Sequence, residues 1–256
     1  MIANYHTHTP RCHHAIGEEE AYVLRAIEQG LQILGFSDHV PMPFPDGHQQ
    51  GYRVRIEELG DYVRTVEALR EKYRDQITIR LGFEAEYYPS RFEDMLRLLG
   101  QYDYDYLILG QHFIDNEQSA YMGVPTDSEA VLCRYVDQVI EGLETGKFTY
   151  LAHPDLVHFT GEDVIYEQHM RRLCRACLDM NIPLEVNLLG LEDGRQYPCD
   201  KFFRIAALTG NRVILGCDAH RPEAVADPQI LARGQAFCQR HGLHLLETVA
   251  LRDPRA

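Results

Sequence analysis

Residues 106–112 read YLILGQH, which is an apolar run followed by a glycine and then by a glutamine and a histidine. A short run with few polar side chains is typical of a strand buried on both faces of a parallel sheet. Similar runs occupy residues 2–6, 33–38, 77–84, 149–153, 183–188 and 213–220. Helix-compatible stretches separate them, at residues 17–30, 56–73, 91–99, 128–145, 162–180, 200–209 and 228–241. This alternation predicts an α/β protein with a parallel sheet.

Polar side chains that can bind metal or substrate stand at the C-terminal end of nearly every run. They are His6, His8, His39, Glu84, His112, His153, Asn187, Asp218 and His220. An open doubly wound sheet concentrates its site at one or two switch-point strands, whereas a closed ring lets every strand end face one point. We therefore predict a TIM-barrel-like fold of seven strands in a single domain, residues 1–256. Residues 243–249 are compatible with an eighth strand or a terminal helix.

The charge is strongly acidic, with 39 acidic and 25 basic residues and a net charge of −14, alongside 13 histidines. Such a chain is a poor non-specific partner for nucleic acid or anionic lipid. Seven irregularly spaced cysteines favour free thiols in a reducing compartment. The sequence has neither an apolar stretch of about 20 residues nor a signal-peptide pattern. We therefore predict a cytoplasmic protein without nucleic-acid or membrane partners; oligomeric state is not predicted.

The histidines and two carboxylates predict a metal site with several ions. His6 and His8 are two apart on a strand, so their side chains leave the same face. The pair His13 and His14 follows in the next loop. An open zinc-type site uses three protein ligands, so about nine ligands indicate three ions if a carboxylate is shared. Glu84 is the natural bridge because a carboxylate has two oxygens. Mixed nitrogen and oxygen ligands suit zinc, manganese or iron.

The motifs HTHT (6–9), CHHA (12–15), SDH (37–39), GFE (82–84), QH (111–112), HPD (153–155) and DAH (218–220) together resemble the motif series of the polymerase-and-histidinol-phosphatase (PHP) family. The resemblance covers about residues 4–222 and implies a distorted (β/α)7 barrel with a trinuclear metal site. The ligands that it implies are His6, His8, Glu84 and Asp218 for a first ion, Glu84, His112 and His153 for a second, and His14, His39 and His220 for a third. It favours His14 over His13, and it implies that Asp38 and Asp155 orient ligands.

Within the family, the chain is most similar to the histidinol-phosphatase branch, through its length and through HPDLV (153–157) and NLLG (187–190). The resemblance implies hydrolysis of L-histidinol phosphate to L-histidinol and phosphate, a step of histidine biosynthesis. Glu192 stands where the branch has an arginine expected to bind phosphate, and His158 stands where it often has a basic residue. Arg195 is the replacement expected for phosphate binding. The departures leave another small phosphate ester or a nucleotide as alternative substrates.

The predicted mechanism is attack on phosphorus by a hydroxide that bridges the ions sharing Glu84. An arginine, Arg195 or Arg11, is expected to pair with two phosphate oxygens. Asp218 and His220 complete the predicted catalytic set with Glu84, and Asp218 or a histidine is expected to protonate the leaving group. The expected partners are a small phosphorylated substrate and inorganic phosphate.

Three other classes are compatible with parts of this pattern. An amidohydrolase-like C–N hydrolase also uses HxH on a first strand, but it often bridges its metals with a modified lysine, and Lys72, Lys147 and Lys201 all lie away from strand ends. A nuclease or polymerase-accessory domain is opposed by the acidic charge. A metal-binding module without catalytic activity is the third alternative.

Overall fold

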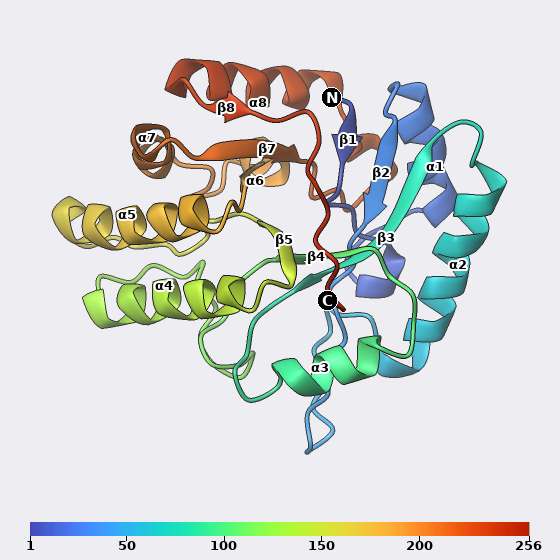
Figure 1. Cartoon of the computed structure of the whole chain (residues 1–256), viewed down its shortest axis with the longest axis horizontal. Coiled ribbons are helices and arrows are strands. Elements are labelled where there is room, and N and C mark those ends of the chain that lie inside the picture. The colour runs from blue at the N-terminus through green and yellow to red at the C-terminus, as the bar shows by residue number, and fades with distance from the viewer. Residues whose placement is uncertain (256) are drawn as a thin grey trace.

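The computed structural model describes residues 1–255 and shows eight strands that run parallel in chain order. They are β1 (Ala3–Asn4), β2 (Ile33–Phe36), β3 (Thr78–Ala85), β4 (Tyr106–Leu109), β5 (Phe148–Leu151), β6 (Leu184–Asn187), β7 (Arg212–Gly216) and β8 (His244–Leu245). The sheet curls, with the helices around its outside (Figure 1). This arrangement confirms the predicted TIM-like (β/α) barrel.

The helices occupy the stretches that the sequence predicts. They are α1 (Glu19–Glu28), α2 (Leu59–Lys72), α3 (Phe92–Leu99), α4 (Glu129–Glu144), α5 (Asp163–Asp179), α7 (Asp200–Thr209) and α8 (Pro228–His241). Local sequence sets several boundaries. The Asp227 side chain accepts hydrogen bonds from the amides of Gln229 and Ile230 at the start of α8, and Gly242 ends that helix in the left-handed region. Within residues 1–255, no helix is both long and apolar enough to cross a membrane.

Short helices complete the fold, and the sequence did not predict them. They are α6 (Leu188–Asp193) and the 3-10 helices η1 (Pro10–Cys12), η2 (Ile56–Glu58) and η3 (Pro222–Ala224). Helix α6 starts directly after β6, where the Asn187 side chain accepts a hydrogen bond from the amide of Gly190 at 2.8 Å. The apolar residues at 188 and 189 look like a continuation of the strand, which is why the sequence did not predict this helix.

The two ends of β7 have different neighbours. At the C-terminal end of the strands, the amide of His8 donates to the carbonyl of Ala219 at 2.9 Å, and the amide of Ala219 donates to the carbonyl of His6 at 3.3 Å. A parallel bridge between Thr7 and Ala219 therefore joins the segments that follow β1 and β7. At the other end, β7 pairs with β8 through Arg212 and Val213. The predicted ring of seven strands is thus extended by one two-residue strand, β8.

The inside of the barrel holds a separate cluster of apolar side chains. This inner cluster consists of Ala3, Tyr5, Tyr106, Ile108, Tyr150, Ala152 and Ile214, with Val249 and Leu251 of the C-terminal segment packed against it. The Tyr106 hydroxyl lies 2.8 Å from the carbonyl oxygen of Tyr5 and 3.0 Å from that of Phe36, and its one hydrogen can bond to either. Glycine at position 82 leaves room for the ring, because a Cβ there would lie 2.4 Å from Tyr106.

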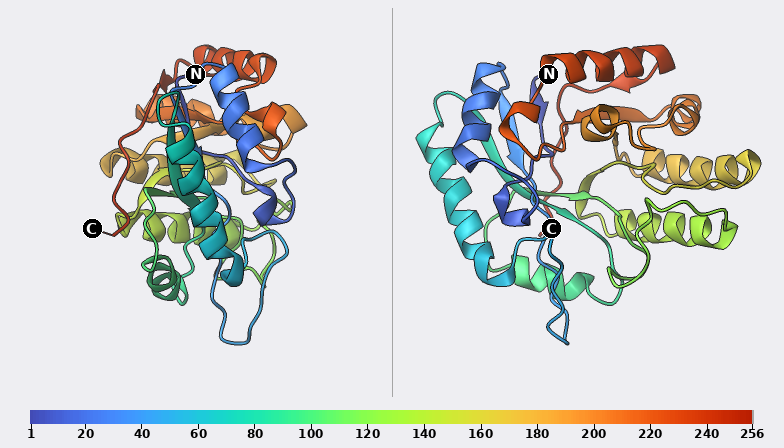
Figure 2. Two further views of the ribbon diagram at one scale, coloured as in Figure 1. Left: turned by 90° about the vertical axis from the view of Figure 1, so that its right-hand side faces the viewer. Right: turned by 180° about the vertical axis from the view of Figure 1, so that it is seen from behind.

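The two sides of the barrel carry different segments. In the left-hand view of Figure 2, the C-terminal segment lies on the opposite side from the long loop between β2 and α2. The C-terminal segment covers the inner cluster, and the amide of Arg252 donates to the Thr149 hydroxyl at 3.2 Å. The end of the barrel that is open to a ligand is therefore the other one, where the long loops follow the C-terminal ends of the strands.

Candidate metal centre

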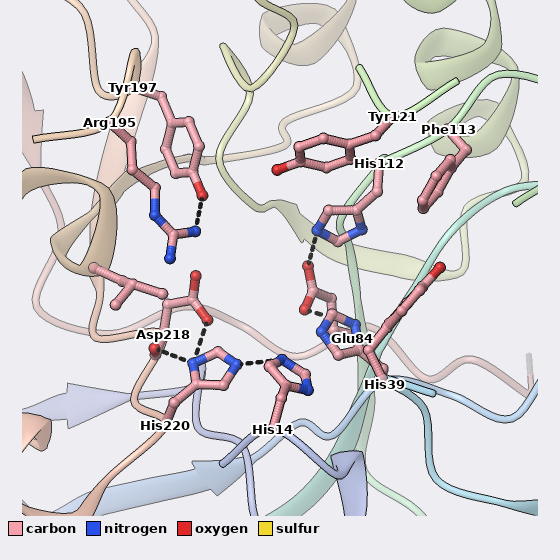
Figure 3. A pocket seen from close by; sticks show the side chains of 12 residues that line it. His14, His39, Glu84, His112, Phe113, Tyr121, Arg195, Tyr197, Asp218 and His220 are labelled. Atoms are coloured by element: carbon pink, nitrogen blue, oxygen red, sulfur yellow. Dashed lines mark hydrogen bonds and ion pairs between the residues drawn. The ribbon is translucent and has the colours of Figure 1, made fainter. Parts of the chain in front are cut away.

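The structure brings the nine predicted ligand side chains together at the C-terminal end of the barrel. Six of them line a cavity of about 370 Å³ (Figure 3), namely His14, His39, Glu84, His112, Asp218 and His220. The other three, His6, His8 and His153, are at most 2% exposed and contact the carboxylates of this set. The cavity floor is therefore a layer of imidazoles and carboxylates.

Glu84, near the end of β3, lies at the middle of this layer. One of its oxygens, Oε2, is 3.2 Å from His6 Nε2, 3.3 Å from His8 Nε2 and 3.2 Å from His39 Nδ1. These three rings come from two different strand ends, so the convergence depends on the curl of the barrel. A single carboxylate oxygen thus faces three imidazole nitrogens.

The second oxygen of Glu84 faces a different pair of rings. Oε1 lies 2.8 Å from His153 Nε2 and 3.6 Å from His112 Nε2. Gly110, just after β4, makes room for this oxygen, because a Cβ there would lie 1.8 Å from it. The geometry matches a bridging carboxylate, with one oxygen directed at each group of histidines.

Asp218 supplies a second carboxylate beside the first group. Its Oδ1 lies 3.1 Å from His8 Nε2, 3.4 Å from His6 Nε2 and 3.5 Å from His220 Nδ1. The side chain of Asn187 donates a hydrogen bond to its Oδ2 at 3.1 Å. The backbone of Asp218 has a positive φ of 49°. Non-glycine residues rarely adopt such values, and they concentrate at functional sites.

The hydrogen bonding of the buried imidazoles fits a metal ion. Both ring nitrogens of His8 and the Nδ1 atoms of His39 and His153 are buried and find no hydrogen-bond partner within residues 1–255. His8 Nε2 has carboxylate oxygens 3.1 and 3.3 Å away, yet neither contact has hydrogen-bond geometry. Leaving a buried polar atom unpaired costs about 1–3 kcal/mol. Metal ions bound at His8 Nε2 and at His39 Nδ1 would satisfy both atoms.

Four of the side chains carry the charge state that a metal ligand needs. Burial lowers the pKa of His39 well below its usual value and that of His220 to about 3. Burial alone would raise the pKa values of Glu84 and Asp218, but the surrounding histidines outweigh it and hold both well below their usual range. Neutral imidazole and ionised carboxylate are the forms that bind divalent metal.

The structure distinguishes between the two adjacent histidines of the first loop. His14 Nε2 lies 2.8 Å from His220 Nε2, and His14 Nδ1 lies 2.8 Å from the carbonyl of Cys12. His13 ends η1 with a positive φ of 61°, and its Nε2 lies 3.2 Å from Glu58 Oε2. The tight turn therefore directs His14 into the cavity and His13 away from it.

Glu185 on β6 supports the ligands and was missed by the sequence analysis. Its Oε1 lies 2.7 Å from His6 Nδ1, and its Oε2 accepts hydrogen bonds from the His153 amide and the Asn187 side chain, both at 2.9 Å. A Cβ at Gly216 would lie 1.7 Å from Oε1, so glycine is needed there. The available signal was an acid in the middle of an otherwise apolar strand.

Glu86 has a similar place beside His112. Its Oε1 lies 2.9 Å from His112 Nδ1, which leaves Nε2 directed toward Glu84. A carboxylate that holds the far nitrogen of a ligand histidine fixes the ring and its tautomer. Glu86 is two residues beyond Glu84 in the GFEAE sequence, so the period of a strand could have identified it.

The two aspartates predicted to orient ligands mainly hold backbone. Asp38 accepts a hydrogen bond from the Thr9 amide at 2.8 Å, and its Oδ1 lies 3.8 Å from His8 Nδ1. Asp155 accepts one from the Cys199 amide at 2.6 Å, immediately before α7. Asp38 therefore shapes the turn after His8, and Asp155 fixes the start of a helix.

Of the two predicted phosphate-binding arginines, the structure brings Arg195 to the cavity but not Arg11. Arg195 lines the cavity, donates to the Tyr197 hydroxyl at 2.9 Å and pairs with Asp193 at 2.8 Å. The Arg11 guanidinium pairs with Glu19 at 2.8 Å and Asp61 at 2.5 Å.

The acid at position 192 is neutralised locally. Glu192 forms an ion pair with Arg221, the residue that follows His220. This departure from the branch pattern therefore adds no unpaired negative charge beside the cavity.

Aromatic rings form the upper walls of the cavity. The wall residues are the aromatic Tyr52, Phe113, Tyr121 and Tyr197, together with Leu189. Tyr52 and Phe113 are stacked, with centroids 6.2 Å apart and planes at 14°. In Figure 3, Arg195 and Tyr197 lie on one side, with His112 and Tyr121 on the other. A polar floor below aromatic walls suits a small molecule with an anionic end and a flat apolar end.

Comparison with known proteins gives a consistent result. The chain matches the family described as PHP domain over residues 4–188. It is 29% identical to a probable histidinol-phosphatase of Deinococcus radiodurans, over 88% of each chain. It is 26% identical to the histidinol-phosphatase of Bacillus subtilis, over 84% of this chain and 92% of that protein.

A similar solved structure is the histidinol phosphate phosphatase of Lactococcus lactis complexed with zinc, L-histidinol and phosphate. Its TM-score is 0.74 at 19% identity, covering 97% of this chain and 96% of that one. At this identity, the likeness supports the fold.

Proposed function

The chain belongs to the PHP domain family, and from this premise we propose that it is a metal-dependent phosphomonoesterase whose substrate is L-histidinol phosphate. The products are L-histidinol and phosphate, in histidine biosynthesis. The observation that carries the proposal is Glu84, whose two oxygens face two separate groups of histidines. Relatives of similar length carry the name histidinol-phosphatase. Residues 1–256 act as one PHP-type domain in this proposal.

We infer three divalent ions, of zinc, manganese or iron. The ligand groups are His6, His8, Glu84 and Asp218; Glu84, His112 and His153; and His14, His39 and His220. Supporting contacts are the 3.1–3.4 Å approaches within the first group and the 2.8 Å approach between His14 and His220. When bound, such ions lower the pKa of a water molecule and offset negative charge on phosphoryl oxygens.

The chain's own residues bind and orient the ester. Arg195 donates its N–H groups to phosphate oxygens, exchanging its present contact with Asp193 for the ligand. The Tyr197 hydroxyl, 2.9 Å from Nη1, keeps the guanidinium directed into the cavity. Asp218 is ionised and His220 is neutral, so Asp218 Oδ1 or a ring nitrogen of His220 can first accept a proton from the attacking water and then pass it to the leaving alkoxide.

The aromatic walls support a substrate with a flat heterocycle. Tyr52 and Phe113 present stacked rings on one side, and Tyr197 lies on another. Stacking and edge-on contacts of such rings contribute about 0.5–1.5 kcal/mol beyond area burial. The imidazole of histidinol phosphate is flat, and the cavity has the volume of a small-ligand site.

The test is a substrate comparison on the metal-stripped protein reloaded separately with zinc, manganese and iron. Substrates are L-histidinol phosphate, an alkyl phosphate, a nucleoside monophosphate, a phosphodiester and an amide. We expect the highest kcat/KM with histidinol phosphate, by about tenfold or more over the alkyl ester. Folded, metal-loaded protein that hydrolyses none of the phosphomonoesters would contradict the proposal, and faster amide hydrolysis would favour the C–N hydrolase.

A matched arginine pair tests phosphate binding. Arg195→Met should raise KM for histidinol phosphate about tenfold or more and weaken inhibition by inorganic phosphate, since a charge-assisted pair is lost. Arg11→Met removes an arginine that is engaged outside the cavity and should leave KM unchanged. Equal effects of the two substitutions would remove Arg195 from the proposal.

A further inference from the structure

A buried cluster of three charged residues lies beside the candidate metal centre: Arg53, Glu86 and Glu117, here called the latch. Each is at most 3% exposed. Arg53 Nε and Nη2 lie 2.7 and 2.6 Å from Glu117 Oε2, and Nη2 also lies 2.8 Å from Glu86 Oε2. Arg53 Nη1 donates to the carbonyl of Val40 at 3.0 Å. One guanidinium therefore joins two carboxylates that come from different parts of the chain.

Stability alone does not account for the latch. A buried ion pair is often no more stabilising than an apolar replacement of similar volume, because desolvation offsets the attraction. The latch has two acids for one base, and His48 Nε2 approaches Glu117 only to 3.7 Å. What distinguishes the latch is its other end, where Glu86 Oε1 lies 2.9 Å from Nδ1 of the proposed ligand His112.

The latch also joins the two loops that build the aromatic walls. Arg53 follows Tyr52 in the loop between β2 and α2, and Glu117 lies in the loop after β4, which carries Phe113 and Tyr121. Gln50 adds a hydrogen bond from its side chain to the carbonyl of Glu117 at 3.0 Å. The stacking of Tyr52 on Phe113 therefore occurs directly beside the charged contact.

We propose that Arg53 is a positioning residue that couples the order of these two loops to the orientation of His112, through Glu117 on one side and Glu86 on the other. Arg53 holds the walls against each other and holds Glu86 at the angle at which it fixes the His112 ring. The inference rests on the proposed function in one respect, namely that His112 holds an ion. Binding of metal and ordering of the substrate walls then reinforce each other.

The test uses Arg53→Met, Glu117→Gln and Glu86→Gln, with Arg70→Met as matched control. Arg70 also pairs with an acid, Asp105, and donates to a backbone carbonyl, that of Ile79, but it lies outside the cavity. The readouts are metal affinity by chelator competition, hydrogen exchange of residues 41–55 and 113–126 in the metal-loaded protein, and kcat and KM measured separately.

The proposal predicts a different pattern for each variant. Arg53→Met weakens metal affinity 10–100-fold, the range for lost support of a ligand, and speeds exchange in both loops about tenfold or more. Glu86→Gln lowers metal affinity with little change in loop exchange. Glu117→Gln speeds loop exchange and raises KM more than it lowers kcat. Arg53→Lys does not restore either property, because an ammonium lacks the planar fork.

The outcomes separate this inference from the proposed function. If Arg53→Met changes metal affinity and loop exchange no more than Arg70→Met, the latch only stabilises the fold and the inference is wrong. If Arg53→Met does not fold, Arg53→Lys and Glu117→Gln decide by the same readouts. If wild-type protein hydrolyses no phosphomonoester, the proposed function fails, while metal affinity and exchange still decide on the latch.

Discussion

The two halves of the barrel interior differ sharply, and β4 with the residues after it passes through both. Tyr106 and Ile108 point into the apolar half, where the inner cluster packs. The next position at this two-residue spacing is Gly110, which has no side chain and so leaves room for the Glu84 carboxylate. The position after that is His112, which lines the polar cavity. Within seven residues, the inward side chains change from an aromatic core to a candidate metal ligand.

This difference shows how the fold separates stability from chemistry. Burial of apolar side chains, among them the Tyr106 ring that its hydrogen bond holds in place, stabilises the apolar half. The polar half places Glu84 and Asp218 among buried histidines, which is unfavourable until cations join them. Substitutions in the two halves should therefore affect different measurements.

Glu84→Gln should have the largest effect and should affect the polar half alone. The neutral amide of glutamine lacks the negative charge with which Glu84 can bridge ions held by two groups of imidazoles. We therefore expect loss of bound metal and a fall in kcat of at least about 10³-fold, which corresponds to a barrier higher by about 4 kcal/mol. The measurements are kcat and metal content. Glu57→Gln, at an exposed acid of η2, is the control. Activity within tenfold of wild type would show that Glu84 is not the bridge.

Ile108→Ala should give the converse result in the apolar half. Removing a fully buried isoleucine leaves a cavity, so the free energy of unfolding should drop by about 2–5 kcal/mol. The kcat of the folded protein should stay near wild type. Urea unfolding and kcat are the measurements, and Leu208→Ala, at a side chain 77% exposed, is the control. Lost activity without lost stability would contradict the separation of the halves.

Glu185→Gln tests the layer that supports the ligands. The His6 ring loses its charged partner at 2.7 Å, and we expect metal affinity to weaken 10–100-fold, or about 1.4–2.7 kcal/mol. Competition with a chromophoric chelator measures it, and Glu129→Gln, at an exposed acid of α4, is the control. An unchanged affinity would mean that Glu185 serves packing rather than the ligand.

A pH dependence of metal affinity is a further property that only the polar half should show. Burial lowers the pKa values of His6 and His8, but nearby carboxylates, Asp218 foremost, outweigh it and raise both well above 6.5 in the metal-free protein. Metal must therefore displace protons, so affinity should increase with pH up to the raised pKa values of these histidines, by about tenfold per unit for each proton displaced. Chelator competition between about pH 6 and about pH 8 checks the slope.

A flat affinity profile over this range would contradict the pH prediction. In the apolar half, burial raises the pKa values of Tyr106 and Tyr150 well above their usual range, so both stay neutral. Unfolding of the apolar half should therefore contribute no pH dependence in the same window.

The sequence predicted what depends on local pattern. The strand ends of a parallel barrel meet at one point, so placing His39, Glu84 and His153 at strand ends was enough to bring them together. It could not predict partners that only tertiary structure supplies. Glu185 and His6 are 179 residues apart, and Arg53 and Glu117 are 64 apart. For the same reason, the sequence could not show that Arg11 is engaged by acids of two other helices.

The bridge between Thr7 and Ala219 joins two segments that are synthesised far apart in time. The segment with His6 and His8 leaves the ribosome well before the segment with Asp218 and His220. A nascent chain that ends before residue 218 lacks Asp218, one of the two carboxylates, and Ala219, which pairs with Thr7 to close the ring. The candidate centre therefore cannot be completed on a partial chain, and chains that stop early would carry exposed histidines without a finished site.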